Sequence, residues 1–398
     1  MNVFVINSGS SSIKYQLISM PEEKVICSGM VDRIGQDGSR VDYRAFLKEQ
    51  PVELSKNMPI SDHSAGLREV AKLLVDKEIG VITNPDEVEA VGHRVVHGGE
   101  KFASTQLITE EVKAKIKELF PLAPLHNPAN YLGIEVAEQI FSNAKQVAVF
   151  DTAFHQTQPP VAFRMAIPNE FYEKNGIRAY GFHGTSHKYV SERARDYLGS
   201  EGKRIVSIHL GNGCSMAAIQ DGKSIDTSMG FGPMNGLVMG TRVGDIDQSV
   251  IFHLVQELGY SLEEVFQILN KKSGMLGLTG FSDMRDIQKK YIAGDGEAKL
   301  AYHLYAYRIK KYIGSFAAIL NGLDAIIFTG GVGENDRLTR QLVCSEMDFL
   351  GIELDAEKNA APKKAVQEIQ SQNSKVKLLV IPTNEELEIA KQSFHLLN

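Results

Sequence analysis

The sequence predicts an α/β protein whose two domains share one topology. The chain has 398 residues, more than a single hydrophobic core usually supports, so two domains are expected. A strand, a turn rich in glycine or serine, and further strands open the chain, and the same order returns at residues 205–227. Segments with apolar residues at helical spacing follow both openings, so each domain is expected to combine a sheet with helices.

The first opening runs from residue 3 to residue 31. The apolar run 3–7 ends in the cluster N-S-G-S-S-S, residues 13–18 alternate like a strand, and residues 25–31 supply a third strand. Three consecutive strands predict an antiparallel start. This start differs from the βαβ opening of a dinucleotide-binding fold.

The second opening has the same order. An apolar run at residues 205–210 ends in a glycine turn, and two more strands follow it. Asp221-Gly222 lies between these strands and has the composition of a tight hairpin turn. I-N-S-G at residues 6–9 aligns with I-H-L-G at residues 208–211, which indicates an internal duplication.

Seven segments carry apolar residues at the spacing of a helix. They are residues 65–77, 109–119, 130–141, 185–198, 247–258, 262–271 and 298–321. Asn127-Pro128 has the composition of a helix cap followed by proline. Residues 146–150 and 325–329 are predicted to be buried strands. No proline-rich or serine-rich linker occurs, so the domain boundary is expected in a compact connection just after Phe150.

The composition bounds the kind of protein. Hydrophobic residues at 43% and charged residues at 23% are ordinary for a globular protein, and a net charge of −6 argues against a broad nucleic-acid surface. The three cysteines are far apart and form no CxxC pair, which favours a reducing compartment. Neither a signal peptide at the start nor an apolar stretch long enough to cross a membrane is apparent. A cytoplasmic protein without nucleic-acid or membrane partners is expected.

Residues 7–14, N-S-G-S-S-S-I-K, form the first candidate site. A turn between strands offers backbone N–H groups and hydroxyls to an anion, and Lys14 adds a positive charge. The alternative is an ordinary serine-rich hairpin tip. A Walker A loop is absent, because Ala217 stands where the first glycine before Gly222-Lys223-Ser224 belongs.

Two further candidates follow predicted strands. G-H-R-V-V-H-G-G at residues 92–99 places Arg94 and two histidines between glycines, and the planar guanidinium suits a carboxylate or phosphate. A strand–turn with a surface arginine is the alternative. Asp151 follows the apolar run 146–150, where a carboxylate is a common catalytic, metal-binding or capping residue.

In the second half, H-G-T-S-H places His183 and His187 one helical turn apart. A zinc pair is disfavoured, since Gly184 replaces the glutamate of the metalloprotease motif, and a histidine acting on an anion at the helix start is preferred. Arg242 lies in a glycine-rich stretch, followed by Asp245 and Asp247, which are candidates for capping the next helix.

Two segments near the C-terminus complete the candidates. T-G-G-V-G-E-N at residues 329–335 follows a strand, and such a loop lets the backbone approach a nucleotide closely. P-T-N-E-E at residues 382–386 has the composition of a helix start. The alternative is that its paired carboxylates bind Mg²⁺, which prefers oxygen ligands.

Together these segments resemble the acetate kinase family, within the superfamily of sugar kinases, Hsp70 and actin. V-F-V-I-N-S-G-S-S-S-I-K at residues 3–14 and A-V-G-H-R-V-V-H-G-G at residues 90–99 are similar to the two signature motifs of that family. G-N-G-C-S at residues 211–215 and the loop 329–335 resemble the looser phosphate and adenosine loops of the superfamily. The resemblance covers essentially the whole chain.

The resemblance implies two actin-like ATPase (ribonuclease H-like) domains with a nucleotide cleft between them. The first comprises residues 1–150 and is completed by a C-terminal helix at 385–398, and the second, at 151–384, binds the nucleotide. The implied nucleotide-binding residues are Lys14, His209, Leu210, Gly211, Asn212, Gly213, Asp283, Met284, Arg285, Gly331, Val332, Gly333, Glu334 and Asn335. The implied ligands of Mg²⁺ or Mn²⁺ are Asn7 and Glu385.

The resemblance also implies a reaction, the reversible in-line transfer of a phosphoryl group from ATP to acetate, carried out by a homodimer. The implied catalytic residues are Arg94, Asp151, His183 and Arg242. Arg94 is also expected to bind the substrate, and the implied pocket for the methyl group of acetate consists of Val96, Leu125, Phe182 and Pro233. Phosphoryl transfer needs alignment and positive charge, and a carboxylate needs no general base, so Asp151 is interpreted as a positioning or charge-organising residue.

Three alternatives remain open. A propionate or butyrate kinase of the same family would have more room than the β-branched Val96 leaves, although one methylene is worth only about 1–3 kcal/mol of discrimination. A non-enzymatic ATP-binding protein would not need Arg94, Arg242 or an apolar pocket. A sugar kinase would need an acidic base and a polar pocket, whereas Phe182 and Pro233 are apolar.

Overall fold

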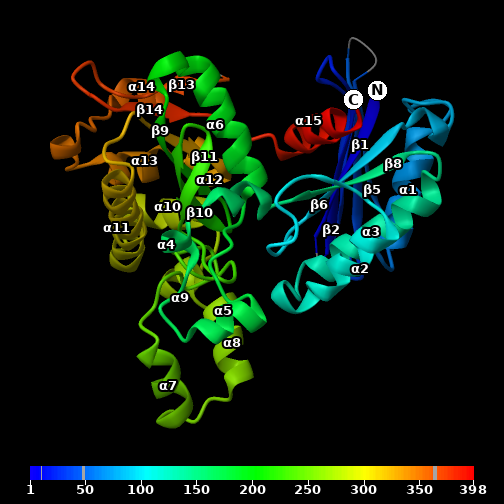
Figure 1. Ribbon diagram of the computed structural model, residues 1–398. Helices are drawn as coiled ribbons and strands as arrows, with labels where there is room; N and C mark the ends of the chain where they lie inside the picture. Colours follow the sequence, from blue (N-terminus) through cyan, green and yellow to red (C-terminus); the bar gives the residue numbers. More distant parts are fainter. Residues whose placement is uncertain (10, 47–49, 362–364) are drawn as a thin grey trace. The chain divides into compact units, whose positions relative to one another are not determined.

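The computed structural model describes residues 1–9, 11–46, 50–361 and 365–398 (Figure 1). Ser10 of the serine-rich loop therefore lies outside the described residues. The chain divides into two compact units. Unit 1 comprises Met1–Phe154 and Asn384–Asn398, and unit 2 comprises His155–Thr383. Among the residues that the model describes, no helix is long and apolar enough to cross a membrane.

Unit 1 contains one mixed sheet of eight strands in the order β5-β4-β3-β2-β1-β6-β8-β7. The strands are β1 Asn2–Ser8, β2 Ser12–Ser19, β3 Lys24–Asp32, β4 Arg40–Ala45, β5 Val52–Asn57, β6 Ala90–Val95, β7 Gln106–Leu107 and β8 Lys145–Phe150. The first five strands form an antiparallel meander, whereas β6 runs parallel to both β1 and β8. The carboxyl ends of β1, β6 and β8 therefore meet at one edge of the sheet.

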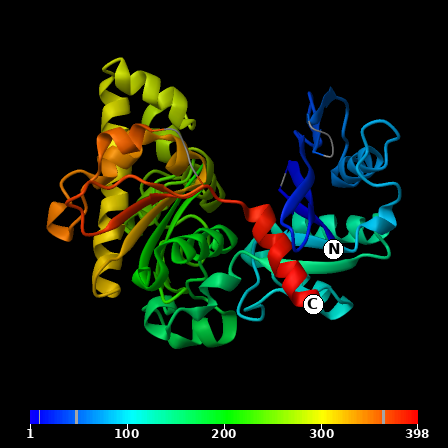
Figure 2. The same ribbon diagram turned by 90° about the horizontal axis from the view of Figure 1, so that it is seen from above.

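Helices cover both faces of this sheet. They are α1 His63–Leu74, α2 Glu110–Glu118, α3 Asn127–Ile140 and α15 Glu385–Leu397, with 3₁₀ turns η1 Pro85–Glu87 and η2 Phe120–Leu122. Phe4 and Phe141 belong to one core with buried residues of α1, and their ring centroids lie 5.2 Å apart. The other face receives α15, which packs on β1, β6 and β8 (Figure 2).

Gly92 shows how closely α15 approaches the sheet. A Cβ at Gly92 would lie 2.7 Å from Ile389 and 2.8 Å from Ser393, both on α15. Only a residue without a side chain fits between this helix and β6. The first glycine of the motif at residues 92–99 thus serves packing.

Unit 2 contains a six-stranded mixed sheet in the order β11-β10-β9-β12-β14-β13. Its strands are β9 Arg204–Leu210, β10 Cys214–Gln220, β11 Lys223–Thr227, β12 Ala325–Thr329, β13 Gln367–Glu368 and β14 Lys377–Val380. The β10–β11 hairpin turns at Asp221 and Gly222, whose φ angles of 49° and 80° are those of the predicted tight turn. β12 runs parallel to both β9 and β14.

The two sheets share one order and one set of strand directions. β3-β2-β1-β6-β8 of unit 1 corresponds to β11-β10-β9-β12-β14 of unit 2, with three antiparallel strands followed by two parallel ones. The predicted duplicated α/β fold is confirmed. Neither sheet begins with a βαβ crossover, because β1 and β9 each pair antiparallel with the next strand.

The helices of unit 2 include the predicted ones and several short ones. They are α4 Pro160–Phe163, α5 Asn169–Asn175, α6 Gly184–Leu198, α7 Ser249–Gln256, α8 Leu262–Lys271, α9 Gly274–Thr279, α10 Met284–Ile292, α11 Gly296–Ile319, α12 Gly330–Asn335, α13 Arg337–Cys344 and α14 Ala356–Ala360. The remaining 3₁₀ turns are η3 Ala153–Thr157, η4 Gly199–Glu201 and η5 Asp348–Leu350. α6 packs on β9 and β12, while α11 packs on β9 and β10.

Candidate functional site

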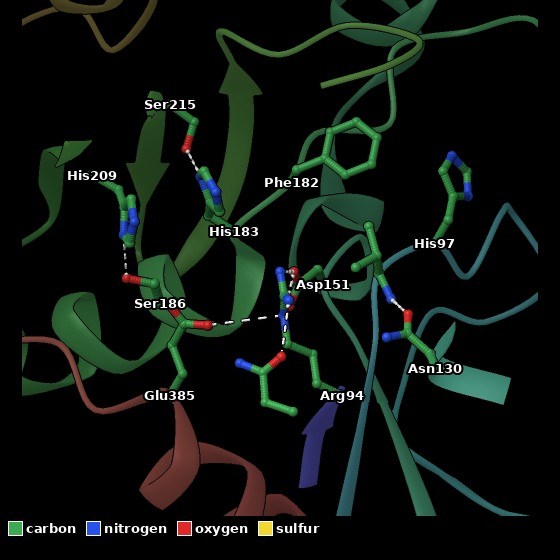
Figure 3. A network of polar contacts seen from close by, with 12 residues as sticks. Arg94, His97, Asn130, Asp151, Phe182, His183, Ser186, His209, Ser215 and Glu385 are labelled. Carbon is green, nitrogen blue, oxygen red and sulfur yellow. Dashed lines mark hydrogen bonds and ion pairs between the residues drawn. The ribbon is translucent and has the colours of Figure 1, made fainter. Parts of the chain in front are cut away.

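Arg94 and Asp151 form the centre of a charged cluster in unit 1 (Figure 3). Arg94 lies near the end of β6 and Asp151 directly follows the neighbouring strand β8, so the parallel pairing brings them together. Arg94 Nε donates to Asp151 Oδ2 at 2.9 Å, and Nη2 donates to the same oxygen. Arg94 Nη1 donates to Asn7 Oδ1 at 3.1 Å, and Glu385 Oε2 lies 3.9 Å from Arg94 Nε.

Burial and charge together set the protonation of this cluster. Burial opposes the charge of Arg94, but Asp151 and Glu385 outweigh burial and raise the pKa of Arg94 above its ordinary value. Burial raises the pKa of Glu385 to about 7, with Asp151 and Glu386 adding to the rise and Arg94 opposing it. The guanidinium is therefore permanently charged, while a nearby carboxyl titrates near neutral pH.

Two asparagines of α3, which the sequence did not single out as site residues, fix the backbone after β6. Asn130 Oδ1 accepts from Val96 N at 3.0 Å (Figure 3). Its Nδ2 donates to Ser8 O at 2.6 Å. Asn127 Oδ1 accepts from His97 N and its Nδ2 donates to His97 O, both at 3.0 Å. The predicted helix start at Asn127-Pro128 is confirmed, but His126 holds the cap position and the Asn127 side chain binds the His97 backbone instead.

The fit of the cluster to a divalent cation can be judged from its donors. Among the described residues, no group of three or more His, Cys, Asp or Glu side chains is arranged to hold a metal ion. Mg²⁺ usually takes one or two carboxylates and completes its shell with water and substrate phosphates. The amide oxygen of Asn7 and the carboxylates of Asp151 and Glu385 suit that chemistry. The raised pKa of Glu385 shows that a positive charge beside it would be stabilising.

Unit 2 contains a pocket of about 640 Å³, within the range of small-molecule sites. Eight of the predicted nucleotide-binding residues line it, namely Gly211, Asn212, Asp283, Met284, Arg285, Gly331, Val332 and Asn335. The other lining residues are Gly240, Met275, Ser282, Gln288, Tyr305 and Asp336, which the sequence did not indicate. The two predicted glycine loops and the segment 283–285 thus meet at one pocket.

Other predicted nucleotide-binding residues lie beside this pocket without lining it. They are His209, Leu210, Gly213, Gly333 and Glu334, whereas Lys14 belongs to unit 1. Leu210 is buried beneath the loop, and a Cβ at Gly330 would lie 2.7 Å from its carbonyl oxygen. Gly330 has a φ of 77°, so glycine is required there by both conformation and space.

His183, Arg242 and Gly213 lie together in unit 2. His183 precedes α6 with a φ of 56°, and its ring stacks on His209 with 4.4 Å between centroids. A Cβ at Gly213 would lie 3.5 Å from both His183 Nε2 and Arg242 Nη2. Arg242 Nη1 donates to Pro233 O at 2.7 Å. A histidine and a guanidinium therefore both lie beside this loop.

The predicted acyl-pocket residues come from both units. Val96 and Phe182 are buried, Pro233 is partly exposed, and Leu125 is 48% exposed. Val96 and Leu125 belong to unit 1, while Phe182 and Pro233 belong to unit 2. Their assignment as one pocket stays a prediction.

The acidic residues after Arg242 have structural roles. Asp247 Oδ1 accepts from Ser249 N at 2.9 Å at the start of α7, which is the local role expected of it. Asp245 instead accepts from Gly236 N and from Tyr312 Oη, both at 2.8 Å. Asp245 thereby anchors the glycine-rich stretch that carries Arg242.

Comparisons with known proteins place the chain in a family. The model of the acetokinase family matches residues 2–391. An acetate kinase of Flavobacterium johnsoniae is 59% identical over 397 residues, covering 100% of both chains, and one of Thermotoga maritima is 53% identical over 398 residues, covering 99% and 98%. A solved acetate kinase of Porphyromonas gingivalis is 44% identical with a TM-score of 0.92, covering 100% of both chains. A solved propionate kinase of Francisella tularensis is 42% identical, also at 0.92, covering 99% of both. The chain belongs to the acetokinase family.

Proposed function

We propose that this protein transfers the terminal phosphoryl group of ATP to acetate, giving acetyl phosphate and ADP, and that it also catalyses the reverse reaction. The observation that carries the proposal is full-length identity of 59% and 53% to two proteins named acetate kinase. Two features of this chain support it. Unit 1 contains the permanently charged guanidinium of Arg94 near the end of a strand, and unit 2 contains a pocket of nucleotide size between glycine loops.

In unit 1, Arg94 is proposed to bind the carboxylate substrate. Its guanidinium is oriented by Asp151 and Asn7, so little side-chain freedom is lost when an anion binds. A carboxylate is already a nucleophile, so no residue has to remove a proton from it. Asp151 therefore acts as a positioning residue for Arg94.

Asn7 and Glu385 are proposed to hold Mg²⁺ or Mn²⁺, with Asp151 close by. When it is bound, the cation neutralises charge on the phosphate oxygens. Glu385 is expected to lose its proton when the cation is present, because the positive charge of the cation offsets the burial that raises the pKa of Glu385.

In unit 2, the pocket is proposed to take the nucleoside and the glycine loops its phosphates. Arg242 and His183 are proposed to stabilise the transferring phosphoryl group, since both lie beside Gly213 of the loop. Positive charge and hydrogen-bond donors aimed at the equatorial oxygens are what such a transfer needs.

A propionate kinase is the second candidate, because the solved propionate kinase of Francisella tularensis has the same fold at 42% identity. The experiment is an acyl-phosphate assay with ATP and Mg²⁺ across formate, acetate, propionate and butyrate. The proposal expects the highest kcat/KM with acetate and lower values with propionate. A higher kcat/KM with propionate or butyrate would favour the second candidate, and no acyl phosphate from any acid would refute both.

A homodimer is also proposed. Large apolar side chains are exposed on α7, on α8 and between them, namely Val250, Phe252, Leu258, Tyr260, Leu262 and Phe266. α7 has no buried residue in the single chain. Burial against a second copy would remove this apolar surface from water. Sedimentation of wild type and Phe252→Glu tests this, with a dimer expected for the first and weaker association for the second. The cytoplasmic location stays a prediction from the cysteine pattern.

A further inference from the structure

A chain of buried side chains leads from His183 into unit 2. Ser215 Oγ lies 2.9 Å from His183 Nδ1 (Figure 3) and 2.8 Å from His187 Nε2. His187 Nδ1 lies 2.8 Å from Ser207 Oγ. Ser215, His187 and Ser207 are 0% exposed. These three residues are called the relay below.

The number of hydrogens in the relay is fixed. Burial, with His155 and His209 adding to it, lowers the pKa of His187 well below its ordinary value, so this ring is neutral. A neutral imidazole carries one N–H, and each serine carries one O–H. Each contact of the relay needs one donor and one acceptor. If Ser215 accepted from both rings, its own buried hydrogen would have no acceptor among the described residues, so the three hydrogen bonds are expected to point in the same direction along the chain.

The two possible directions are not equivalent. In the first, Ser207 donates to His187 Nδ1, His187 Nε2–H donates to Ser215, and Ser215 donates to His183 Nδ1. In the second, Ser207 only accepts, and its own hydrogen needs another acceptor. Within the described part of the chain, Ser207 Oγ has no hydrogen bond besides the one to His187. A buried hydroxyl hydrogen without an acceptor is costly, so the first direction is favoured.

We infer that the relay holds His183 as the neutral tautomer that carries its hydrogen on Nε2. When Ser215 donates to Nδ1, the hydrogen of a neutral His183 must lie on Nε2. Nε2 is the atom on the side of Gly213 and Arg242. His183 then donates a hydrogen bond where the transferring phosphoryl group is proposed to lie. The inference rests on the proposed function, and the relay residues are positioning residues, because they act only through His183.

The kinetic test removes one hydroxyl of the relay. Ser215→Ala is expected to lower kcat about tenfold, because the fraction of His183 in the donating tautomer falls, while the KM values for ATP and acetate change less than about twofold. Ser215→Thr keeps the hydroxyl and is expected to restore much of the loss. Ser191→Ala is the matched control, because Ser191 on α6 is buried like Ser215 but donates to Lys188 O and lies outside the relay. An unchanged kcat in Ser215→Ala would overturn the inference.

A spectroscopic test reads the tautomer without using activity. Long-range ¹H–¹⁵N spectra of protein labelled at its histidines distinguish Nδ1–H from Nε2–H, and His183→Gln assigns the signal. The wild type is expected to show Nε2–H for His183, and Ser207→Ala and Ser215→Ala are expected to show mixtures. A wild-type His183 with its hydrogen on Nδ1 would overturn the inference. If Ser215→Ala does not fold, the wild-type and Ser207→Ala spectra decide.

The same variants separate this inference from the proposed function. If His183→Gln keeps full kcat, the proposed role of His183 in transfer is wrong, and the spectra alone decide whether the relay sets its tautomer. If His183→Gln is inactive but Ser215→Ala changes neither kcat nor the spectrum, the proposed role stands and the relay is refuted.

Discussion

Replacing Arg94 with methionine removes the guanidinium that donates twice to Asp151 and once to Asn7. The side chain of Asp151 is 1% exposed, so its charge would remain in a buried place without its main cationic partner. Removing one partner of a buried ion pair typically costs about 3–5 kcal/mol. We expect the free energy of unfolding of unit 1 to fall by that amount.

A double-mutant cycle isolates the charge contribution. Asp151→Asn removes the carboxylate charge at nearly constant volume, so the pair Arg94→Met and Asp151→Asn contains neither charge. Residues in direct contact couple by about 0.5–3 kcal/mol. We expect the loss of stability in the double variant to be smaller than the sum of the two single losses by at least about 1 kcal/mol. Arg94→Lys keeps the charge but loses the fork, so its loss should be smaller.

Urea unfolding followed by tryptophan fluorescence measures the free energy of unfolding of unit 1 alone. The chain contains no tryptophan, so Phe120→Trp places the only tryptophan at η2 in unit 1. Every variant of the cycle is made in that background, and acyl-phosphate formation is assayed in parallel. Effects that add within about 0.3–0.5 kcal/mol would refute the coupling of the two charges. Normal turnover in Arg94→Met would refute its role in binding the carboxylate.

Four further outcomes follow from the site. Arg242→Ala should lower turnover at least about tenfold with unchanged circular dichroism, and Arg242→Lys should restore it only partly. Val96→Ala should raise the propionate-to-acetate ratio of kcat/KM several-fold, since a buried CH₂ is worth about 0.8 kcal/mol, and an unaltered ratio would place the acyl group elsewhere. Asn130→Ala should raise KM for acetate but not for ATP, because the backbone of Val96 loses its hydrogen-bond acceptor. The raised pKa of Glu385 favours its protonated form in the folded state, so the free energy of unfolding should fall as pH rises from about 4.5 to about 7. Glu385→Gln should remove that part of the pH dependence of Tm.

The sequence predicted the long, regular elements well. The predicted helix at residues 262–271 matches α8, where Ser261 and Glu264 form a capping box that a local pattern specifies completely. The predicted helix at 65–77 instead begins at His63, because Asp62 caps it by accepting from Ala65 N. The helices α10 and α13 were not among the seven predicted segments, although α2 and α7, which are equally short, were predicted.

The site was predicted where chemistry follows a strand end and missed where it depends on distant contacts. Arg94 lies at a glycine-flanked strand end and Asp151 follows an apolar run, and parallel pairing of β6 with β8 brings these ends together. Asn130 escaped prediction because its partner Ser8 is 122 residues away and is bound through a backbone carbonyl. Asn384 caps α15, as the composition of segment 382–386 predicted. Glu385 lies 3.9 Å from Arg94, and its role in binding Mg²⁺ stays a prediction.

Duplication explains why each unit carries its functional groups at equivalent strand ends. In unit 1, the ends of β1, β6 and β8 carry Asn7, Arg94 and Asp151, which are polar or charged and hydrogen-bonded to one another. In unit 2, the equivalent ends of β9 and β12 lead into glycine loops around Gly211 and Gly330, which leave room for a pocket instead. The same topology thus provides two edges with the same strand order and directions. Polar and charged side chains fill one edge, whereas glycines leave room for a pocket at the other, so the difference between the units follows from residue choice at a few strand ends.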